Sequence, residues 1–259
     1  MQNKDRVVDY IVGWLTDYLS ETPLKGYIVG VSGGVDSALT STLCARTGQQ
    51  VMLLNMPIRQ TSEEFSRSQR QIDQLSEQFE NVSGLEIDLT KTFDHFEGDM
   101  PSVTSKDQMA MANSRARLRM TTLYAIGQSN GLLVAGTGNK VEDFGVGFYT
   151  KYGDGGVDVS PIADLMKSEV YALAEHLNVI PEILSAPPTD GLWGDGRSDE
   201  DQIGATYDEL EWAMRFTGDV NQLNDRSKKV LDIYNRLHGA NRHKMIPIPV
   251  CEIPQEIKE

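Results

Sequence analysis

Gly30-Val31-Ser32-Gly33-Gly34-Val35-Asp36-Ser37 is a glycine-rich loop between an apolar run and a helical pattern. The run, residues 27–31, has the length of a short buried strand, and the helical pattern covers residues 36–46. The paired glycines let the backbone approach an anion closely. Free N–H groups at the start of a helix favour phosphate, and the two serines add hydroxyl donors. We therefore expect a phosphate-binding strand–loop–helix unit.

Asp36 is the unusual residue of this loop, because a carboxylate beside phosphates repels them. The repulsion disappears if the carboxylate holds a divalent cation that bridges to the phosphates. The loop is not a Walker A motif, since no lysine follows the glycines, and it lacks the GxGxxG spacing of dinucleotide-binding loops. We expect Asp36 to bind a metal ion such as Mg²⁺.

The same alternation of strand and helix continues along the chain. Further strands are predicted at residues 51–54, 85–87 and 132–135, and helices at residues 7–19, 65–79, 107–128, 170–177, 207–214 and 230–237. Short apolar strands alternating with helices indicate a Rossmann-like α/β fold, a parallel sheet with helices on both faces. We expect a single domain over residues 1–259, with ligands at the carboxyl ends of the strands.

Composition restricts the classes of partner. The formal net charge is −14, which disfavours nucleic acid and anionic membrane surfaces. No apolar run approaches the roughly 20 residues of a membrane span, and the first residues lack an apolar signal core. Cys44 and Cys251 form no CxxC pair, which excludes a zinc ribbon or dithiol centre. We expect a cytoplasmic protein.

The order Ser-Gly-Gly-x-Asp-Ser resembles the PP-loop of ATP pyrophosphatases, in which the loop grips the β and γ phosphates of ATP. Two later segments, residues 136–142 and 148–158, narrow the similarity to the NAD synthetase family, over about residues 25–244. The resemblance implies ATP contacts for the whole loop, Gly30, Val31, Ser32, Gly33, Gly34, Val35, Asp36 and Ser37, and for Thr137, Lys167 and Thr189. It also implies that Asp36 and Glu142 bind Mg²⁺.

The resemblance further implies that deamido-NAD, the dinucleotide substrate, contacts Arg117, Lys151, Asp158, His243 and Lys244. Three arginines lie on one helix, and at about 100° per residue Arg115 and Arg119 share a face while Arg117 points away. The resemblance favours Arg117, so we interpret the other two as surface or interface residues. NAD synthetases are homodimers with the dinucleotide site at the subunit boundary. The helix over residues 107–128 is therefore either an interface element or part of its own core.

The reaction implied is the ATP-dependent amidation of deamido-NAD through an adenylated intermediate. At neutral pH ammonia is mostly ammonium, so a base is useful, and Asp154 and Glu200 are the candidates by position. No cysteine system for glutamine hydrolysis is evident, so we expect free ammonia or ammonia from a separate protein. The alternatives are another PP-loop enzyme, of the GMP synthetase or tRNA-modifying kind, and a non-catalytic nucleotide-binding protein.

Overall fold

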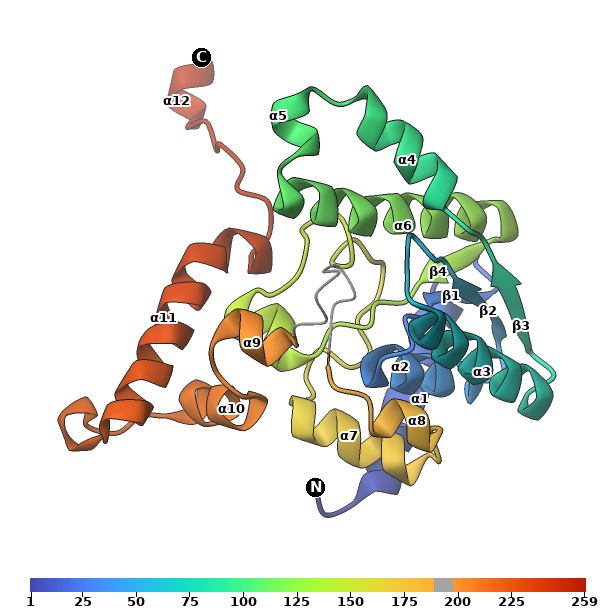
Figure 1. Ribbon diagram of the computed structural model, residues 1–259, viewed down its shortest axis with the longest axis horizontal. Coiled ribbons are helices and arrows are strands. Elements are labelled where there is room, and N and C mark those ends of the chain that lie inside the picture. Colours follow the sequence, from blue (N-terminus) through green and yellow to red (C-terminus); the bar gives the residue numbers. More distant parts are fainter. Residues whose placement is uncertain (189–197) are drawn as a thin grey trace.

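A parallel sheet forms the core of the N-terminal two thirds of the chain. The computed structural model describes residues 1–188 and 198–259. The sheet has four strands in the order β3-β2-β1-β4, and every pairing is parallel (Figure 1). The strands are β1 (Gly26–Gly30), β2 (Gln50–Asn55), β3 (Val82–Glu86) and β4 (Leu132–Val134). Ile28 in β1 is aligned with Met52 in β2 and with Val134 in β4.

The strand order creates a crevice beside β1. The chain steps outward from β1 to β2 and β3, then crosses back to place β4 on the other side of β1. The loops after β1 and β4 therefore leave the sheet in opposite directions at its carboxyl edge. In open parallel sheets, ligands bind at such a reversal point.

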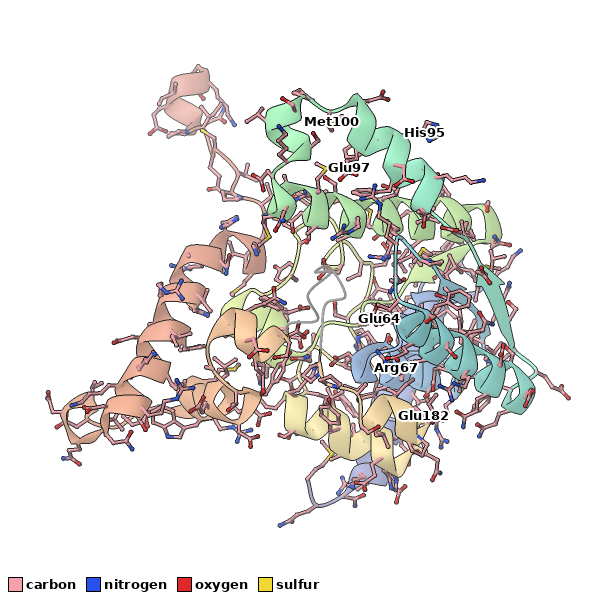
Figure 2. All side chains as sticks on the ribbon, viewed as in Figure 1. Glu64, Arg67, His95, Glu97, Met100 and Glu182 are labelled. Carbon is pink, nitrogen blue, oxygen red and sulfur yellow. The ribbon has the colours of Figure 1, made fainter. Side chains whose placement is uncertain are left out.

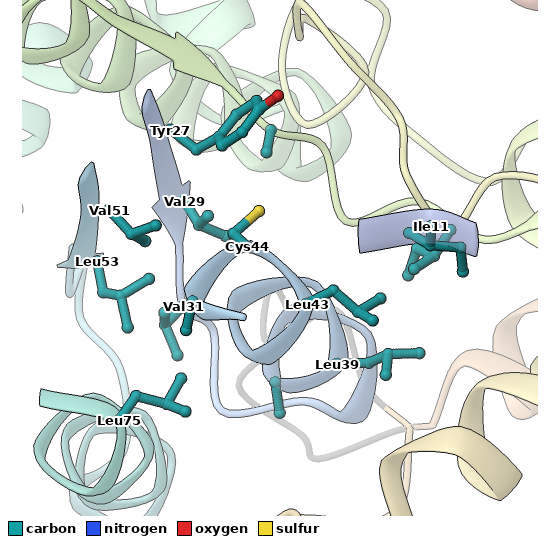
Figure 3. Close-up of a cluster of buried hydrophobic side chains, with 14 of the residues drawn as sticks. Ile11, Tyr27, Val29, Val31, Leu39, Leu43, Cys44, Val51, Leu53 and Leu75 are labelled. Carbon is teal, nitrogen blue, oxygen red and sulfur yellow. The ribbon is translucent and has the colours of Figure 1, made fainter. Parts of the chain in front are cut away.

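Helices cover both faces of the sheet, which confirms the predicted Rossmann-like class. One face packs against α1 (Lys4–Ser20), α2 (Val35–Ala45), α3 (Ser62–Gln78) and α7 (Lys167–His176). Figure 3 shows part of that core, in which Val29 and Leu53 of the sheet meet Leu43 of α2 and Leu75 of α3. The other face packs against α4 (Thr90–Asp99) and α6 (Gln108–Asn130).

A third apolar cluster joins the C-terminal helices to the segment after β4. It contains a π-helical turn, η1 (Val141–Val146), together with α9 (Asp199–Ile203), α10 (Tyr207–Arg215) and α11 (Asp225–Met245). Asn241 of α11 donates a hydrogen bond to the carbonyl of Val146 (2.9 Å), and the ring of His238 contacts the carbonyl of Gly145 (2.8 Å). α11 thus holds the backbone at the end of η1.

Several elements escaped the sequence patterns. These are α4, η1, α9 and the short helices α5 (Ser102–Ser105), α8 (Pro181–Leu184), η2 (Val220–Gln222) and α12 (Gln255–Lys258). The predicted strand at residues 85–87 is also wrong in its bounds, since β3 begins at Val82. Gly84 interrupts the apolar run there because a side chain at this position would collide with Ile72 of α3. Among the described residues, no helix is both long and apolar enough to cross a membrane.

Candidate active site

A cavity of about 530 Å³ opens at the carboxyl edge of the sheet. All eight residues of the loop Gly30–Ser37 line it, as does Thr137 after β4. Gly33 has a positive φ of 83°, and a Cβ there would lie 3.0 Å from the carbonyl oxygen of Glu64 in α3. Figure 2 places Glu64 and Arg67 at the start of α3, on the side toward the centre of the molecule. The loop is therefore held closely between β1 and α3.

Hydrogen bonds within the loop fix its shape. The Ser37 hydroxyl accepts from the backbone N–H of Ser32 (3.1 Å) and donates to the carbonyl of Gly34 (3.0 Å). The hydroxyls of Ser32 and Ser37 also lie 3.1 Å apart. Gly34 is the N-cap of α2 and has no side chain to cap the first amides. Those amides suit an anion in the cavity.

A buried lysine joins two carboxylates beside this loop. The ammonium of Lys167 lies 2.6 Å from Oδ2 of Asp36 and 2.8 Å from Oε1 of Glu142. The exposed fraction of the lysine side chain is 4%, and that of each carboxylate is 17%. Three segments far apart in the sequence therefore meet at one charge cluster.

Two further side chains orient the carboxylates. The Asn139 amide donates to Oδ1 of Asp36 (3.0 Å), and its carbonyl oxygen accepts from the backbone N–H of Glu142 (3.1 Å). The hydroxyl of Tyr207 in α10 donates to Oε1 of Glu142 (2.6 Å). No role was predicted for either residue, because both act through contacts formed only in the folded chain.

The environment shifts the pKa values of this cluster. Burial raises the pKa of Asp36 above its ordinary value, although Lys167 opposes the shift. Burial also acts on Glu142, but Lys167, Tyr207 and Asn139 outweigh it and hold the pKa of Glu142 below its usual range. Burial disfavours the charged form of Lys167, yet both carboxylates outweigh it and raise the pKa of that ammonium. The surroundings therefore favour the charged forms of Lys167 and Glu142 and oppose that of Asp36.

The donor set suits a hard cation. Asp36 and Glu142 direct carboxylate oxygens at the same positive charge, and oxygen ligands are those that Mg²⁺ prefers. No group of three or more histidine, cysteine, aspartate or glutamate side chains poised for a metal occurs in the described part of the chain. Mg²⁺ commonly binds through one or two carboxylates together with substrate phosphates and waters. The two carboxylates fit that pattern.

Of the other carboxylates that line the cavity, Asp154 and Asp143 have raised pKa values. Asp154 accepts a hydrogen bond from the backbone N–H of Thr150 (3.0 Å), and desolvation by the surrounding protein raises its pKa. Burial, followed by repulsion from Glu142 and Asp154, raises the pKa of Asp143 to about 8. Glu200 is not among the lining residues; its carboxylate accepts from the backbone N–H of Tyr207 (2.8 Å). Of the two predicted base candidates, Asp154 therefore lines the cavity and Glu200 does not.

Most of the predicted dinucleotide contacts lie outside the cavity wall. Arg117, Lys151 and His243 form a connected surface group: Nη2 of Arg117 lies 3.4 Å from the carbonyl oxygen of Lys151, and Nζ of Lys151 lies 2.7 Å from that of His243. Lys244 does line the cavity, where its ammonium donates to the carbonyls of Gly147 and Tyr149 (2.8 Å each).

Asp158 closes the loop between η1 and α7 onto the sheet. One carboxylate oxygen accepts from the backbone N–H of Val134 in β4 (2.8 Å), and the other accepts from the hydroxyl of Tyr124 in α6 (3.0 Å). Thr189 lies outside the described residues.

The interpretation of Arg119 as a surface or interface residue was wrong. Arg119 lines the cavity, and its Nε donates to the carbonyl of Met56 after β2 (3.0 Å). The helical spacing correctly separated it from the exposed Arg117, but spacing alone does not reveal which face meets the cavity. Arg115 lies over the ring of Phe93, 5.6 Å from its centre.

Comparison with known proteins places this site in a family. The NAD synthase family model matches residues 7–246. This chain belongs to the NAD synthase family. The predicted resemblance is thereby confirmed, and with it a ligase activity.

Relatives and solved structures agree with this membership. The NAD synthase chain is 35% identical to the NH(3)-dependent NAD(+) synthetase of Mesoplasma florum over 92% of each chain. It is also 35% identical to the enzyme of the same name from Sulfurisphaera tokodaii, over 93% of this chain and 87% of that one. The NMN synthetase of Francisella tularensis superposes with a TM-score of 0.85 at 30% identity, covering 98% of this NAD synthase chain and 100% of its own.

Proposed function

We propose that this chain is an ammonia-dependent NAD synthetase, which uses ATP to convert deamido-NAD to NAD with release of AMP and pyrophosphate. The observation that carries the proposal is the cluster of Asp36, Lys167 and Glu142 beside the loop Gly30–Ser37. Family membership and the relatives' names agree with it.

The first half-reaction forms an acyl adenylate. The nicotinate carboxylate attacks the α-phosphorus of ATP, and the bond to the β-phosphate breaks. Loop amides, the hydroxyls of Ser32 and Ser37, and Lys167 stabilise the departing pyrophosphate. Asp36 and Glu142 would hold Mg²⁺, which when bound neutralises phosphate charge. We assign ATP contacts to Thr137 as well, because it lines the same cavity.

The second half-reaction transfers nitrogen. Ammonia attacks the carbonyl carbon of the adenylate, and AMP leaves with the bonding electrons. Of the two base candidates, Asp154 is the better placed, because it lines the cavity and its pKa is raised above the ordinary value, which makes it a stronger proton acceptor. Asp154 would take the proton that ammonium must lose.

We also propose that the active form is a homodimer. Arg117, Lys151 and His243 lie together on the surface and away from the cavity of their own subunit. Such a group can complete the dinucleotide site of a second copy.

Mixing two inactive variants tests the shared site. An Asp36→Asn variant and an Arg117→Ala variant are mixed, unfolded together and refolded. Random pairing makes half of the dimers mixed, and one of the two shared sites in each mixed dimer then has both residues intact, which is about a quarter of all sites. Recovery of activity above that of either variant alone supports the shared site. Activity no higher than the sum of the two variants contradicts it.

A mononucleotide is the second candidate substrate. The match to the NMN synthetase of F. tularensis is at 30% identity over nearly the full length of both chains. The corresponding reaction would amidate the deamido mononucleotide in the same cavity, with the same loop and carboxylates. The two candidates differ only in whether an adenylyl group extends from the nicotinate ribotide.

We place the enzyme in the cytoplasm. Cys44 and Cys251 are both free thiols, as suits a reducing compartment, and the substrates are intracellular metabolites.

One assay tests the function. The protein is incubated with ATP, Mg²⁺ and ammonium, and with either deamido-NAD or the deamido mononucleotide, and the formation of AMP and of each amide is followed. Asp36→Asn and Glu142→Gln should each lower turnover at least 100-fold, the scale of losing one charge-stabilising group. The matched control Asp17→Asn changes an exposed carboxylate on α1 and should behave as wild type. If no AMP forms with deamido-NAD and none forms with the deamido mononucleotide, the proposal is wrong.

A further inference from the structure

Arg119 reaches the cavity from the side opposite Lys167. It belongs to α6, which packs on one face of the sheet, whereas Lys167 begins α7 on the other face. Both side chains line the cavity. The Nε of Arg119 donates to the carbonyl of Met56 (3.0 Å). This bond fixes the plane of the guanidinium and leaves its two terminal nitrogens for another partner.

The cations of the wall have different kinds of partner. Four basic and six acidic side chains line the cavity among the described residues. Lys167 bridges Asp36 and Glu142, and Lys244 donates to two carbonyls. Nε of Arg67 lies 3.4 Å from the carbonyl oxygen of Gly33. Neither arginine has a carboxylate within ion-pair distance in the described part of the chain, and Arg119 is the one that enters from the sheet face opposite Lys167.

A buried guanidinium without a carboxylate within ion-pair distance is costly. Burial lowers the pKa of Arg119 to about 10, and repulsion from Arg115 adds to the shift, while attraction by the more distant carboxylates of Glu64 and Asp154 partly opposes it. The group still carries its charge at neutral pH, because the lowered pKa remains well above 7. Desolvated charges are stabilised by pairing, and a guanidinium offers two parallel N–H groups that match a carboxylate or phosphoryl group.

We propose that Arg119 binds an oxyanion of the substrates at the point where the acyl adenylate forms, opposite Lys167. The inference rests on the proposed function. The oxyanion is a carboxylate of the acyl substrate or a phosphoryl oxygen of ATP, which share the same chemistry. Its position on α6 puts Arg119 across the cavity from the cluster that holds the leaving pyrophosphate. The reacting group must lie between the leaving group and the acyl substrate, where two cations from opposite faces can hold it.

The test compares Arg119→Met and Arg119→Lys with Arg46→Met in the full chain. Arg46 is exposed at the end of α2 and serves as the matched control. Turnover is measured with ATP and deamido-NAD varied separately. Calorimetry measures the binding of a non-hydrolysable ATP analogue and of deamido-NAD, each alone. Arg119→Met should lower kcat/KM roughly 10- to 100-fold, the range for one hydrogen-bonded charge pair. Arg119→Lys should lose less, because it keeps the charge but not the paired geometry.

The calorimetric measurements distinguish the two possible sources of the oxyanion. Weaker binding of the ATP analogue alone identifies a phosphoryl oxygen, and weaker binding of deamido-NAD alone identifies the carboxylate. A loss of kcat with both affinities unchanged places the contact in the transition state, which also supports the proposal.

A structural role is distinguished by chemical rescue. Added guanidinium at non-denaturing concentrations should partly restore Arg119→Ala and leave Arg46→Met unchanged. Kinetics of Arg119→Met within twofold of wild type for both substrates would overturn the proposal. So would a loss that follows a lowered melting temperature and is not rescued. If Arg119→Met does not fold, the kinetics of Arg119→Lys and the rescue of Arg119→Ala by guanidinium test the proposal in its place. If wild type makes no amide at all, the proposed function fails instead.

Discussion

Replacing Lys167 with methionine removes the positive charge between Asp36 and Glu142. Methionine keeps much of the apolar stem, so the packing against the walls is largely preserved. The two carboxylates then lie together, each with an exposed fraction of 17%, without the ammonium that now contacts both. Breaking a buried ion pair by removing one partner costs about 3–5 kcal/mol, because an uncompensated charge stays buried. We expect Lys167→Met to lose that much unfolding free energy at neutral pH in the absence of divalent ions.

Magnesium should offset part of this loss. If Asp36 and Glu142 can hold a divalent cation, Mg²⁺ stabilises the variant in proportion to the logarithm of its concentration above its dissociation constant. Wild type should respond less, because Lys167 already neutralises the site. Acid should also narrow the difference, since without the lysine both carboxylates have raised pKa values and protonate as the pH falls.

Urea unfolding at several Mg²⁺ concentrations measures both effects. The control is Lys140→Met, which removes an exposed ion pair with Asp164 (2.7 Å) on the surface. Such pairs contribute about 0–1 kcal/mol, so this variant should unfold nearly as wild type does. A loss below 1 kcal/mol for Lys167→Met would refute the reasoning on the buried cluster. An equal response of wild type and variant to Mg²⁺ would refute the assignment of the carboxylates to the metal.

Three further changes have defined outcomes. Tyr207→Phe removes the hydroxyl that donates to Glu142 and should lower turnover about 5- to 20-fold, with a stability loss of about 1–2 kcal/mol by urea unfolding. Glu209→Gln removes a carboxylate whose pKa an arginine of α11 lowers to about 2. The contribution of this ionised carboxylate to stability is present above its ordinary pKa and is lost as the pH falls toward 2. The variant should therefore have a free energy of unfolding at most about 1 kcal/mol below that of wild type at pH 7, and nearly the same as wild type at pH 2. Gly26→Ala forces a side chain onto the backbone of β2 and should lower the free energy of unfolding by about 1–3 kcal/mol. Gly13→Ala, which has open space around it, should leave the melting temperature unchanged or raise it.

The sequence was most informative where chemistry is local. The loop Gly30–Ser37 carries its own signal, because glycines, serines and the following helix are contiguous and their phosphate-binding geometry needs no distant partner. Strands β1, β2 and β4 were equally readable as short apolar runs. β3 was displaced because Gly84, required by the close approach of Ile72, interrupts its pattern. Local signals predict local structure.

The rest of the site depends on packing that no local pattern encodes. Asn139 and Tyr207 orient the carboxylates from segments 68 residues apart, which only the folded chain brings together. Arg119 and Arg117 are two residues apart on one helix, and their placement follows from which face of α6 meets the sheet. The π-helical turn η1 starts where the Asn139 side chain accepts two successive amides, a feature without a periodic signature.

The grip of α11 on the segment after β4 has a consequence for synthesis. His238, Asn241 and Lys244 hold backbone carbonyls of residues 145–149, which lie about 95 positions earlier in the chain. Domains generally fold as the ribosome releases them, from the N-terminus onward. The phosphate loop can therefore form early on a growing chain, while the opposite wall of the cavity waits for the last long helix. A polypeptide that ends before α11 would carry the phosphate loop but lack every one of these contacts to residues 145–149.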